Sequence, residues 1–272
     1  MSRVAIDHEL CTGDGICADV CPKDLLRMEG GFPHLPEGME SRCNLCGQCL
    51  AFCPTGAVSL ERFSDGRVEP VEAALRIGPE QAEQFLKSRR SVRSFTRQPV
   101  SHEVILRLLG AARLAPSGGN NQVVRWIVVE RPETVRELAE LIAQWFDTDA
   151  RTDPVAGKRY AIDSIVSRFR AGSDVILRGA PHLVAACTPP NAVWGAVDSA
   201  IALTFFNLAA HAHGVGCCWA GYFIRAAAAS PAVRDRLGIA PDMVVQGAMV
   251  FGNARYPAYR VPVRNTQVVR WL

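Results

Sequence analysis

Seven of the ten cysteines lie within residues 11–53, and four of them follow a regular spacing. That run reads Cys43-x2-Cys46-x2-Cys49-x3-Cys53-Pro54. Three thiolates at intervals of three residues can each bind one iron of a cubic iron–sulfur cluster, and the fourth, next to proline, ligates a second cluster. Zinc ligands or buried structural thiols would rarely follow this spacing. The run therefore predicts iron–sulfur chemistry in the N-terminal part of the chain.

An earlier copy of the same frame carries an aspartate in place of one cysteine. It reads Cys11-x2-Asp14-x2-Cys17-x3-Cys21-Pro22. Since the fourth cysteine of each run serves the other cluster, one [4Fe–4S] cluster is expected on Cys43, Cys46, Cys49 and Cys21. The second cluster is expected on Cys11, Cys17 and Cys53, with Asp14 at the remaining corner. Residues 1–64 thus resemble a two-cluster bacterial ferredoxin, a small iron–sulfur domain built by internal duplication.

Asp14 leaves the type of the second cluster open. A carboxylate is a harder ligand than a thiolate and binds an iron corner less tightly. The site could therefore hold a [4Fe–4S] cluster with an oxygen ligand, or lose that iron and become [3Fe–4S]. Alternatively, Asp14 is only a turn residue between Gly13 and Gly15 and ligates nothing.

Composition and charge limit the class of protein. The chain has 272 residues, of which 49% are hydrophobic and 21% charged, as in ordinary globular proteins of about two domains. Residues 1–64 carry a net charge of −4 and the remainder +7, without a basic block interleaved with aromatic residues, so no nucleic-acid partner is expected. The longest apolar stretch, 192–210, contains Asp198 and Asn207, so it predicts a buried helix and no membrane span. With no recognisable signal peptide, a cytoplasmic protein is expected.

The remaining chain predicts a linker over 65–78 and an α+β domain over 79–272. Apolar residues at helical spacing indicate helices after residue 79 and near Ser101, and a proline-initiated helix over 132–146. A nearly all-apolar segment predicts a long helix over 194–213. Strands are expected over 123–129, 182–187 and 243–251. The loose alternation of helices and strands favours an α+β layer architecture over a doubly wound sheet.

Three loops of this domain have residue types suited to ligand binding. Residues 89–93 combine closely spaced arginines with a serine, which suits a phosphate, although a solvated basic face is the simpler interpretation. Residues 115–122 offer two glycines and amide side chains that suit a flat heterocycle, or else form an ordinary turn. Residues 214–221 contain Gly-x-Gly and a Cys-Cys pair, and these cysteines are more often buried than ligands.

Together and in this order, the three loops resemble those of the nitroreductase family of FMN-dependent oxidoreductases over residues 80–272. The resemblance implies an α/β sandwich, with a central mixed sheet flanked by helices, in a domain-swapped homodimer with FMN at the subunit interface. It implies FMN contacts from Arg89, Arg90, Ser91 and Arg93 (phosphate and ribityl side), Pro116, Ser117, Asn120 and Gln122 (flavin loop), Cys218, Trp219, Ala220 and Gly221 (N5 edge), and Arg260 and Arg264 (tail). Two positions depart from the family pattern: Val123-Val124 stand where many relatives have Pro-Trp, and Ala220 stands where some nitroreductases have Glu. These departures concern substrate preference.

Other segments receive weaker interpretations. The apolar end of the chain, with Val268, Val269, Trp271 and Leu272, is expected to embrace a partner subunit or to pack on its own domain. Residues 145–178 match no family motif and could lie over the flavin and shape the substrate pocket. His182, His211 and His213 are interpreted as structural, since they begin a buried strand or end a helix.

The fusion of the two modules suggests an electron route. Clusters pass one electron at a time, whereas FMN accepts one or two. We expect electrons from a low-potential donor, a ferredoxin or a reductase, to pass through the clusters to FMN and on to a nitroaromatic, quinone or activated alkene. No dedicated acid or base is visible, so catalytic residues are not assigned. The alternatives are a direct NAD(P)H-dependent nitro or quinone reductase with accessory clusters, and a non-catalytic electron carrier or redox sensor.

Overall fold

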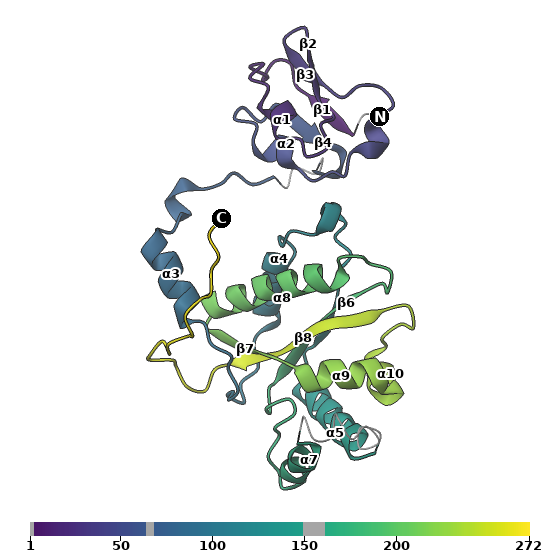
Figure 1. Cartoon of the computed structure of the whole chain (residues 1–272), viewed down its shortest axis with the longest axis vertical. Coiled ribbons are helices and arrows are strands. Elements are labelled where there is room, and N and C mark those ends of the chain that lie inside the picture. The colour runs from purple at the N-terminus through teal and green to yellow at the C-terminus, as the bar shows by residue number, and fades with distance from the viewer. Residues whose placement is uncertain (1–2, 64–67, 149–160) are drawn as a thin grey trace. The chain divides into compact units, whose positions relative to one another are not determined.

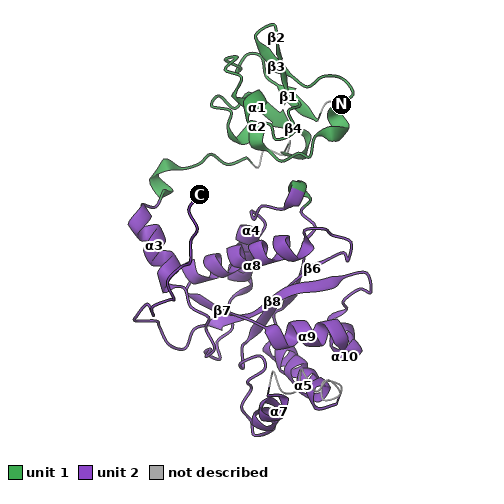
Figure 2. Cartoon of the chain, in the orientation of Figure 1, with its two compact units in different colours: residues 1–76, 119–121 green, residues 77–118, 122–272 purple. Residues whose placement is uncertain are grey.

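The chain forms two compact units in a computed structural model that describes residues 3–63, 68–148 and 161–272 (Figure 2). The first unit comprises Met1–Arg76 together with Gly119–Asn121, and the second comprises Ile77–Gly118 and Gln122–Leu272. Residues 65–67 of the expected linker lie outside the described part of the chain. The expected domain boundaries themselves remain a prediction.

The first unit consists of two short antiparallel strand pairs and single-turn helices around a small core. Strand β1 pairs with β4, and β2 pairs with β3. Its strands are β1 (Val4–Ile6), β2 (Arg27–Glu29), β3 (Phe32–His34) and β4 (Val58–Leu60), and its helices are α1 (Ile16–Asp19), α2 (Gln48–Ala51), η1 (Glu40–Arg42), η2 (Glu61–Phe63) and η3 (Ala73–Leu75). Buried Val4, Leu26 and Leu60 share one apolar cluster with four cysteines of the two runs, namely Cys17, Cys43, Cys49 and Cys53. The cysteine loops therefore pack on this core.

The internal duplication is visible in the backbone of this unit. Helices α1 and α2 each follow a glycine in the left-handed conformation, Gly15 with φ 75° and Gly47 with φ 81°. Gly13 also has a positive φ, and a Cβ there would lie 2.6 Å from the carbonyl oxygen of Gly31. Only glycine adopts these conformations without strain, so the two cysteine runs are folded into matching tight loops.

The second unit is a four-stranded sheet between two layers of helices (Figure 1). The strand order is β5-β6-β8-β7, and all three strand pairs are antiparallel. Its strands are β5 (Arg125–Val129), β6 (His182–Thr188), β7 (Val215–Trp219) and β8 (Val244–Asn253). Its helices are α3 (Pro79–Ser88), α4 (His102–Ala112), η4 (Gly118–Asn120, whose last two residues belong to the first unit), α5 (Pro132–Thr148), α7 (Ile162–Arg170), α8 (Gly195–Ala212), α9 (Gly221–Ala229) and α10 (Pro231–Leu237).

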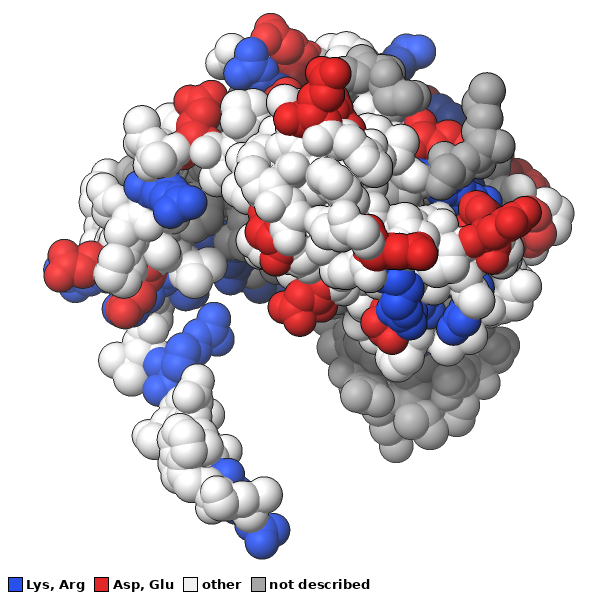
Figure 3. Space-filling view, turned by 90° about the horizontal axis from the view of Figure 1, so that it is seen from above, with Lys and Arg blue, Asp and Glu red and all other residues white. Residues whose placement is uncertain are grey.

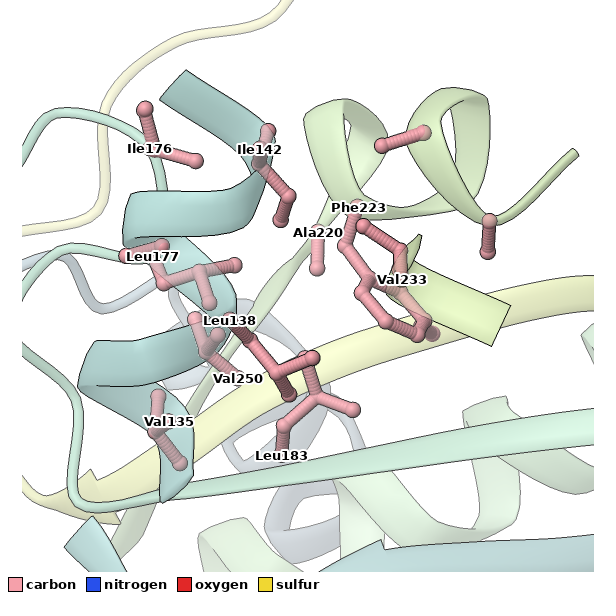
Figure 4. Close-up of a cluster of buried hydrophobic side chains, with 14 of the residues drawn as sticks. Val135, Leu138, Ile142, Ile176, Leu177, Leu183, Ala220, Phe223, Val233 and Val250 are labelled. Atoms are coloured by element: carbon pink, nitrogen blue, oxygen red, sulfur yellow. The ribbon is translucent and has the colours of Figure 1, made fainter. Parts of the chain in front are cut away.

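Successive residues of β6 enter opposite cores, which explains its continuous apolar run. Leu183 and Ala185 pack with α5, α7, α9 and α10, whereas Val184 and Ala186 pack with α4 and α8. Figure 4 shows the first of these cores, where Leu138 of α5, Phe223 of α9 and Val250 of β8 come together. Both faces of the sheet are therefore covered, and strand alternation produces a three-layer arrangement.

The expected helices and strands are present, and the α+β class is confirmed. The expectation of a mixed central sheet is wrong for the four strands, which are antiparallel throughout. Among the described residues, parallel pairing is limited to one isolated bridge between Ser91 and Cys217. The strand expected from residue 123 begins at Arg125, because Gln122 has a left-handed φ of 50° and its N–H donates to Ser117 Oγ.

Acidic and basic side chains are interspersed over the face of the molecule displayed in Figure 3. Within the described ranges, no helix has the length and apolar character needed to cross a bilayer. The long helix α8 buries one face, which includes the polar residues Asp198 and Ser199, whereas Val197 and Phe205 are exposed. The segment 192–210, expected as a buried helix, is therefore buried on one side.

Acid pH is expected to destabilise the second unit through His182. This side chain is fully buried, accepts a hydrogen bond from the Val100 N–H at Nε2 (2.8 Å) and contacts the Glu130 carbonyl oxygen at Nδ1 (2.7 Å). Burial lowers its pKa, although Glu130 acts in the opposite sense. A histidine in the unfolded chain titrates at about pH 6.5. As the pH falls below that value, the unfolded state binds a proton that the folded state does not, so the free energy of unfolding decreases.

Urea unfolding followed by tryptophan fluorescence tests this expectation, because all five tryptophans lie in the second unit. His182→Gln should lose much of the decrease in stability seen between neutral and mildly acidic pH. The matched control, His213→Gln at an exposed position, should keep it. Identical pH dependence in wild type and His182→Gln would contradict the assignment.

Candidate functional site

Four cysteines of the two runs line one cavity in the first unit. Cys21 comes from the first run and Cys43, Cys46 and Cys49 come from the second. The rest of the lining is mostly apolar: Val4, Pro22, Leu25, Leu26, Leu35, Leu45 and Leu60, with Lys23, Asn44, Gly47 and Gln48. The cavity therefore brings together the four thiols that the crossed spacing rule assigns to one [4Fe–4S] cluster.

The chemistry of these thiols fits a metal cluster. Burial, together with the nearby Cys46, Cys43 and Cys21, raises the pKa of Cys49 to about 11. Four thiolates in an apolar cavity are unfavourable by themselves, and bound iron supplies the compensating positive charge. Among the residues that the structure describes, no three His, Cys, Asp or Glu side chains converge on a single ion.

The second cysteine group contains the buried Cys17 and the exposed Asp14. Burial raises the pKa of Cys17, and the charges of Asp14 and Cys11 raise it further, so these three groups are neighbours. Burial also acts on Cys53, but hydrogen bonds from Thr55 and from neighbouring backbone N–H groups outweigh it and lower the pKa. Both oxygens of the Asp14 carboxylate accept hydrogen bonds, Oδ1 from the Ile16 N–H (3.0 Å) and Oδ2 from the Thr12 hydroxyl (3.2 Å).

A second cavity, the arginine pocket, lies in the second unit and has a volume of about 570 Å³. It brings together four of the predicted ligand-binding residues, Arg89, Arg90, Ser91 and Arg93. The other lining residues are Ser88, Val92, Ser94, Asn207, His211, Gly214, Val215, Gly216, Cys217, Ala254, Tyr256, Pro257 and Ala258. Three guanidinium groups with adjacent hydroxyls form a donor set that matches the oxygens of a phosphate group.

The arginine segment is positioned by β7. Arg89 ends α3 with extended backbone angles, and Ser91 then forms a parallel bridge with Cys217. The Val92 N–H donates to the Cys217 carbonyl at 2.9 Å. A Cβ on Gly216 would lie 2.5 Å from a methyl carbon of Val92, so a glycine is required for this close approach. The sheet thereby holds the segment that carries the arginines.

One wall of the arginine pocket was not foreseen from the sequence as a ligand site. Asn207 and His211 stand four residues apart on α8 and both line the pocket. The Nε2 of His211 lies 2.9 Å from Ser88 Oγ, and its ring packs on Phe85 of α3 with centroids 5.0 Å apart. The four-residue spacing of Asn207 and His211 predicts that both lie on one face of a helix. It does not predict which other segment of the chain that face contacts.

The start of the predicted flavin loop is held by a polar contact within the second unit. Within the second unit, the Gly118 N–H donates to Asp198 Oδ1 of α8 at 2.9 Å, and a Cβ on Gly118 would lie 2.3 Å from the Trp194 ring. Asp198 is only 4% exposed. Asn120 belongs to the first unit, where its amide donates to the carbonyls of Asn44 and Leu45 at 3.0 and 3.1 Å. Asp198 is thus a positioning residue that the sequence analysis read only as part of a buried helix.

The remaining predicted site residues do not line the arginine pocket as the described residues define it. These are Pro116, Ser117, Asn120 and Gln122, then Cys218, Trp219, Ala220 and Gly221 at the junction of β7 and α9, and Arg260 and Arg264 beyond β8. Cys218 and Ala220 are buried, whereas Trp219 and Gly221 are exposed. Of the segment 145–178, residues 149–160 lie outside the described part of the chain, and Ile162 and Ile165 of α7 pack into the core.

Comparisons with known proteins assign both units. Residues 86–253 match the model of the Nitroreductase family, and residues 4–27 and 36–59 each match that of the 4Fe-4S binding domain. The first match spans more than half of the chain. The protein therefore belongs to the Nitroreductase family and is an oxidoreductase with an N-terminal ferredoxin-type iron–sulfur domain.

Individual relatives agree with this assignment. A protein from Archaeoglobus fulgidus, named for NADH dehydrogenase and NAD(P)H nitroreductase, is 28% identical over 175 residues, which are 64% of this chain and 85% of that protein. The polyferredoxin MvhB of Methanothermus fervidus is 33% identical over 73 residues, 23% of this chain and 16% of that protein. A nitroreductase from Bacteroides fragilis, solved with bound FMN, has a TM-score of 0.57 and 24% identity, covering 70% of this chain and 99% of that one, and thus shares the fold.

Replacing Asp198 by alanine is expected to loosen the loop before β5. The partly buried Gly118 N–H would lose a hydrogen bond to a charged acceptor, worth about 1.5–3 kcal/mol. Amide hydrogen exchange of residues 116–122 should therefore accelerate by roughly tenfold or more. Asp198→Asn keeps an acceptor oxygen and should accelerate exchange less, and Asp242→Ala, at an exposed position, should leave it unchanged. Unaltered exchange in Asp198→Ala would show that the loop does not depend on this contact.

Proposed function

We propose that this protein is an iron–sulfur flavoprotein oxidoreductase that passes single electrons from a low-potential donor, through its clusters and FMN, to a small organic acceptor. The observation that carries the proposal is the presence, in one chain, of a cavity lined by four cysteines and a pocket lined by three arginines. Because both modules are in the same chain, the electron donor module has a high effective concentration for the flavin module.

The first unit receives the electrons. Cys21, Cys43, Cys46 and Cys49 hold a [4Fe–4S] cluster in the apolar cavity, where exclusion of water and hydrogen bonds to sulfur tune the potential. The second cluster is held by Cys11, Cys17 and Cys53. Since both carboxylate oxygens of Asp14 already accept hydrogen bonds at the start of α1, we assign Asp14 to the turn, and the second cluster to the [3Fe–4S] type.

The second unit binds FMN, which supplies one- or two-electron transfer when bound. The arginines at 89, 90 and 93, with Ser91, bind its phosphate. Pro116, Ser117 and Gln122 supply the flavin loop, and Arg260 and Arg264 return to the phosphate. Residues 218–221 face the N5 edge, although the Ala220 N–H already donates to the Ala248 carbonyl at 2.9 Å. The FMN bound to the Bacteroides fragilis nitroreductase, which shares this fold, supports the choice of cofactor.

A homodimer completes this site. The apolar C-terminal segment is exposed, with Val268, Trp271 and Leu272 each more than 85% accessible. Helix α8 and the segment before it also expose Val193, Trp194 and Val197. Apolar surface of this extent favours burial against another protein surface. We assign it to a second copy of the chain, with the C-terminal segment as an embracing arm.

The acceptor is a nitroaromatic, a quinone or an activated alkene, and residues 145–178 shape its pocket. The domain boundaries are 1–64, 65–78 and 79–272. A reducing compartment such as the cytoplasm suits a chain with ten unpaired cysteines. A redox sensor, in which the Asp14 site loses and regains iron, is the non-catalytic alternative.

Direct reduction by NAD(P)H is the second candidate function. It is favoured by the name of the Archaeoglobus fulgidus relative, which refers to NADH and NAD(P)H. Stopped-flow mixing of the holoenzyme with NADH or NADPH separates the two routes. Reduction of the flavin by the nucleotide at the rate of turnover, with no dependence on the clusters, would favour this candidate.

Cys46→Ala should uncouple the flavin from a low-potential donor. Loss of one thiolate removes the first-unit [4Fe–4S] cluster, so reduction of FMN by reduced ferredoxin should slow by at least tenfold while FMN content stays unchanged. Cys187→Ala, which removes a buried thiol of β6 outside both cysteine runs, is the matched control. Equal rates of FMN reduction in Cys46→Ala and wild type would rule out the proposed electron route.

Asp14→Cys should convert the second cluster. Wild-type protein purified without oxygen should contain about seven irons per chain and give the electron paramagnetic resonance signal of an oxidised three-iron cluster. The variant supplies a fourth thiolate, so iron should rise to about eight and that signal should disappear. Asp14→Asn, which retains the capping acceptor, should resemble wild type. About eight irons in wild type, falling in Asp14→Asn, would instead identify Asp14 as a ligand.

A further inference from the structure

His211 lies in the arginine pocket in a defined hydrogen-bonded state. Ser88 Oγ donates to the Phe85 carbonyl at 3.1 Å and also lies 2.9 Å from His211 Nε2. A hydroxyl has one proton to donate. With the serine proton on the Phe85 carbonyl, the serine oxygen accepts from the imidazole and Nε2 carries the hydrogen. In the neutral ring, Nδ1 is then the unprotonated nitrogen.

The surroundings of His211 disfavour its charged form in the protein alone. Burial lowers its pKa, and the positive charge of Arg89 lowers it further, whereas a hydrogen bond with the Phe85 backbone acts in the opposite sense. The other charged or titratable groups of the pocket wall are Arg90 and Arg93, Cys217 from β7, and Tyr256 after β8. Burial raises the pKa of Cys217 to about 12, so that thiol stays neutral. On α3, Glu83 and Lys87 pair with each other on an exposed face.

A phosphate group in this pocket reverses the local balance of charge. It brings up to two negative charges among three guanidinium groups, and a nearby anion favours the protonated form of an imidazole. Linkage requires that a ligand which raises proton affinity is itself bound more tightly when the proton is present. Binding of phosphate and protonation of His211 would therefore assist each other.

We propose that His211 is a phosphate-linked positioning residue of the arginine pocket, neutral in the protein alone and protonated at Nδ1 from solvent when a phosphate ester binds. Ser88 accepts the Nε2 hydrogen in both states and holds the ring against Phe85. This inference rests on the proposed function, because it takes the phosphate to be that of FMN. It adds a proton to the binding equilibrium, and it makes FMN affinity depend on pH through one residue of α8.

The test compares FMN and riboflavin, which differ by the phosphate. Full-length protein freed of flavin is titrated with each between about pH 8 and about pH 6, and the dissociation constant is read from the quenching of flavin fluorescence. The ratio of the FMN dissociation constant of His211→Asn to that of wild type should rise several-fold as the pH falls, up to about tenfold per pH unit for one linked proton. The same ratio for riboflavin should stay constant. Because unbound FMN is the same ligand in both titrations, the protonation of its phosphate in solution cancels in the ratio.

Two further variants test the interpretation. His213→Asn, an exposed histidine two residues away and outside the pocket lining, should behave as wild type. Ser88→Ala removes the acceptor of the Nε2 hydrogen, so the linkage should move to lower pH. A pH-independent FMN ratio, or a riboflavin ratio that changes as the FMN ratio does, overturns the role of His211. If wild type binds neither flavin at any pH, the proposed function itself fails.

Discussion

The antiparallel pairing of β8 with both β6 and β7 is the constraint on which the second unit depends. It places ten residues of β8 between the two helical layers, and the buried side chains of that strand enter both cores. It also fixes β7 at the edge of the described sheet, where the only remaining partner is the arginine segment. The position of the guanidinium groups therefore follows from strand pairing, together with the absence of a side chain at Gly216.

The first unit is governed by a different balance. Its apolar core is small, and much of it consists of the cysteine-bearing loops themselves. A domain of this size buries too little apolar surface for high stability by itself and relies on metal binding. The left-handed glycines before α1 and α2 create the two loops, and the thiols they direct inward become favourable when iron is bound. Structure and redox function thus rest on the same ligands.

The two cavities have opposite electrostatic character, and this separates their tasks. One is lined by thiols and aliphatic side chains, which suits a buried cluster that exchanges electrons without binding a substrate. The other is lined by guanidinium groups, hydroxyls and a neutral imidazole, which suits an anionic group that must be held in one orientation. A phosphate bound there would anchor a cofactor at one end, leaving its redox-active ring to be positioned by other loops.

The sequence by itself predicted the cluster ligands and determined the type of most elements. Cysteine spacing is a local property, so the crossed set of Cys21, Cys43, Cys46 and Cys49 could be assigned before the fold was known, and the structure places these four around one cavity. Apolar periodicity likewise located β6, α8 and β8, because burial on one or both faces leaves a pattern along the chain. Strand order and direction could not be predicted from this periodicity. The four described strands, expected to form a mixed sheet, pair antiparallel. Only the tertiary structure decided that His211 and Asn207 join the arginines and that Asp198 binds Gly118. These contacts join residues about 80 to 120 positions apart, and no local propensity specifies which distant segment a helix face will meet.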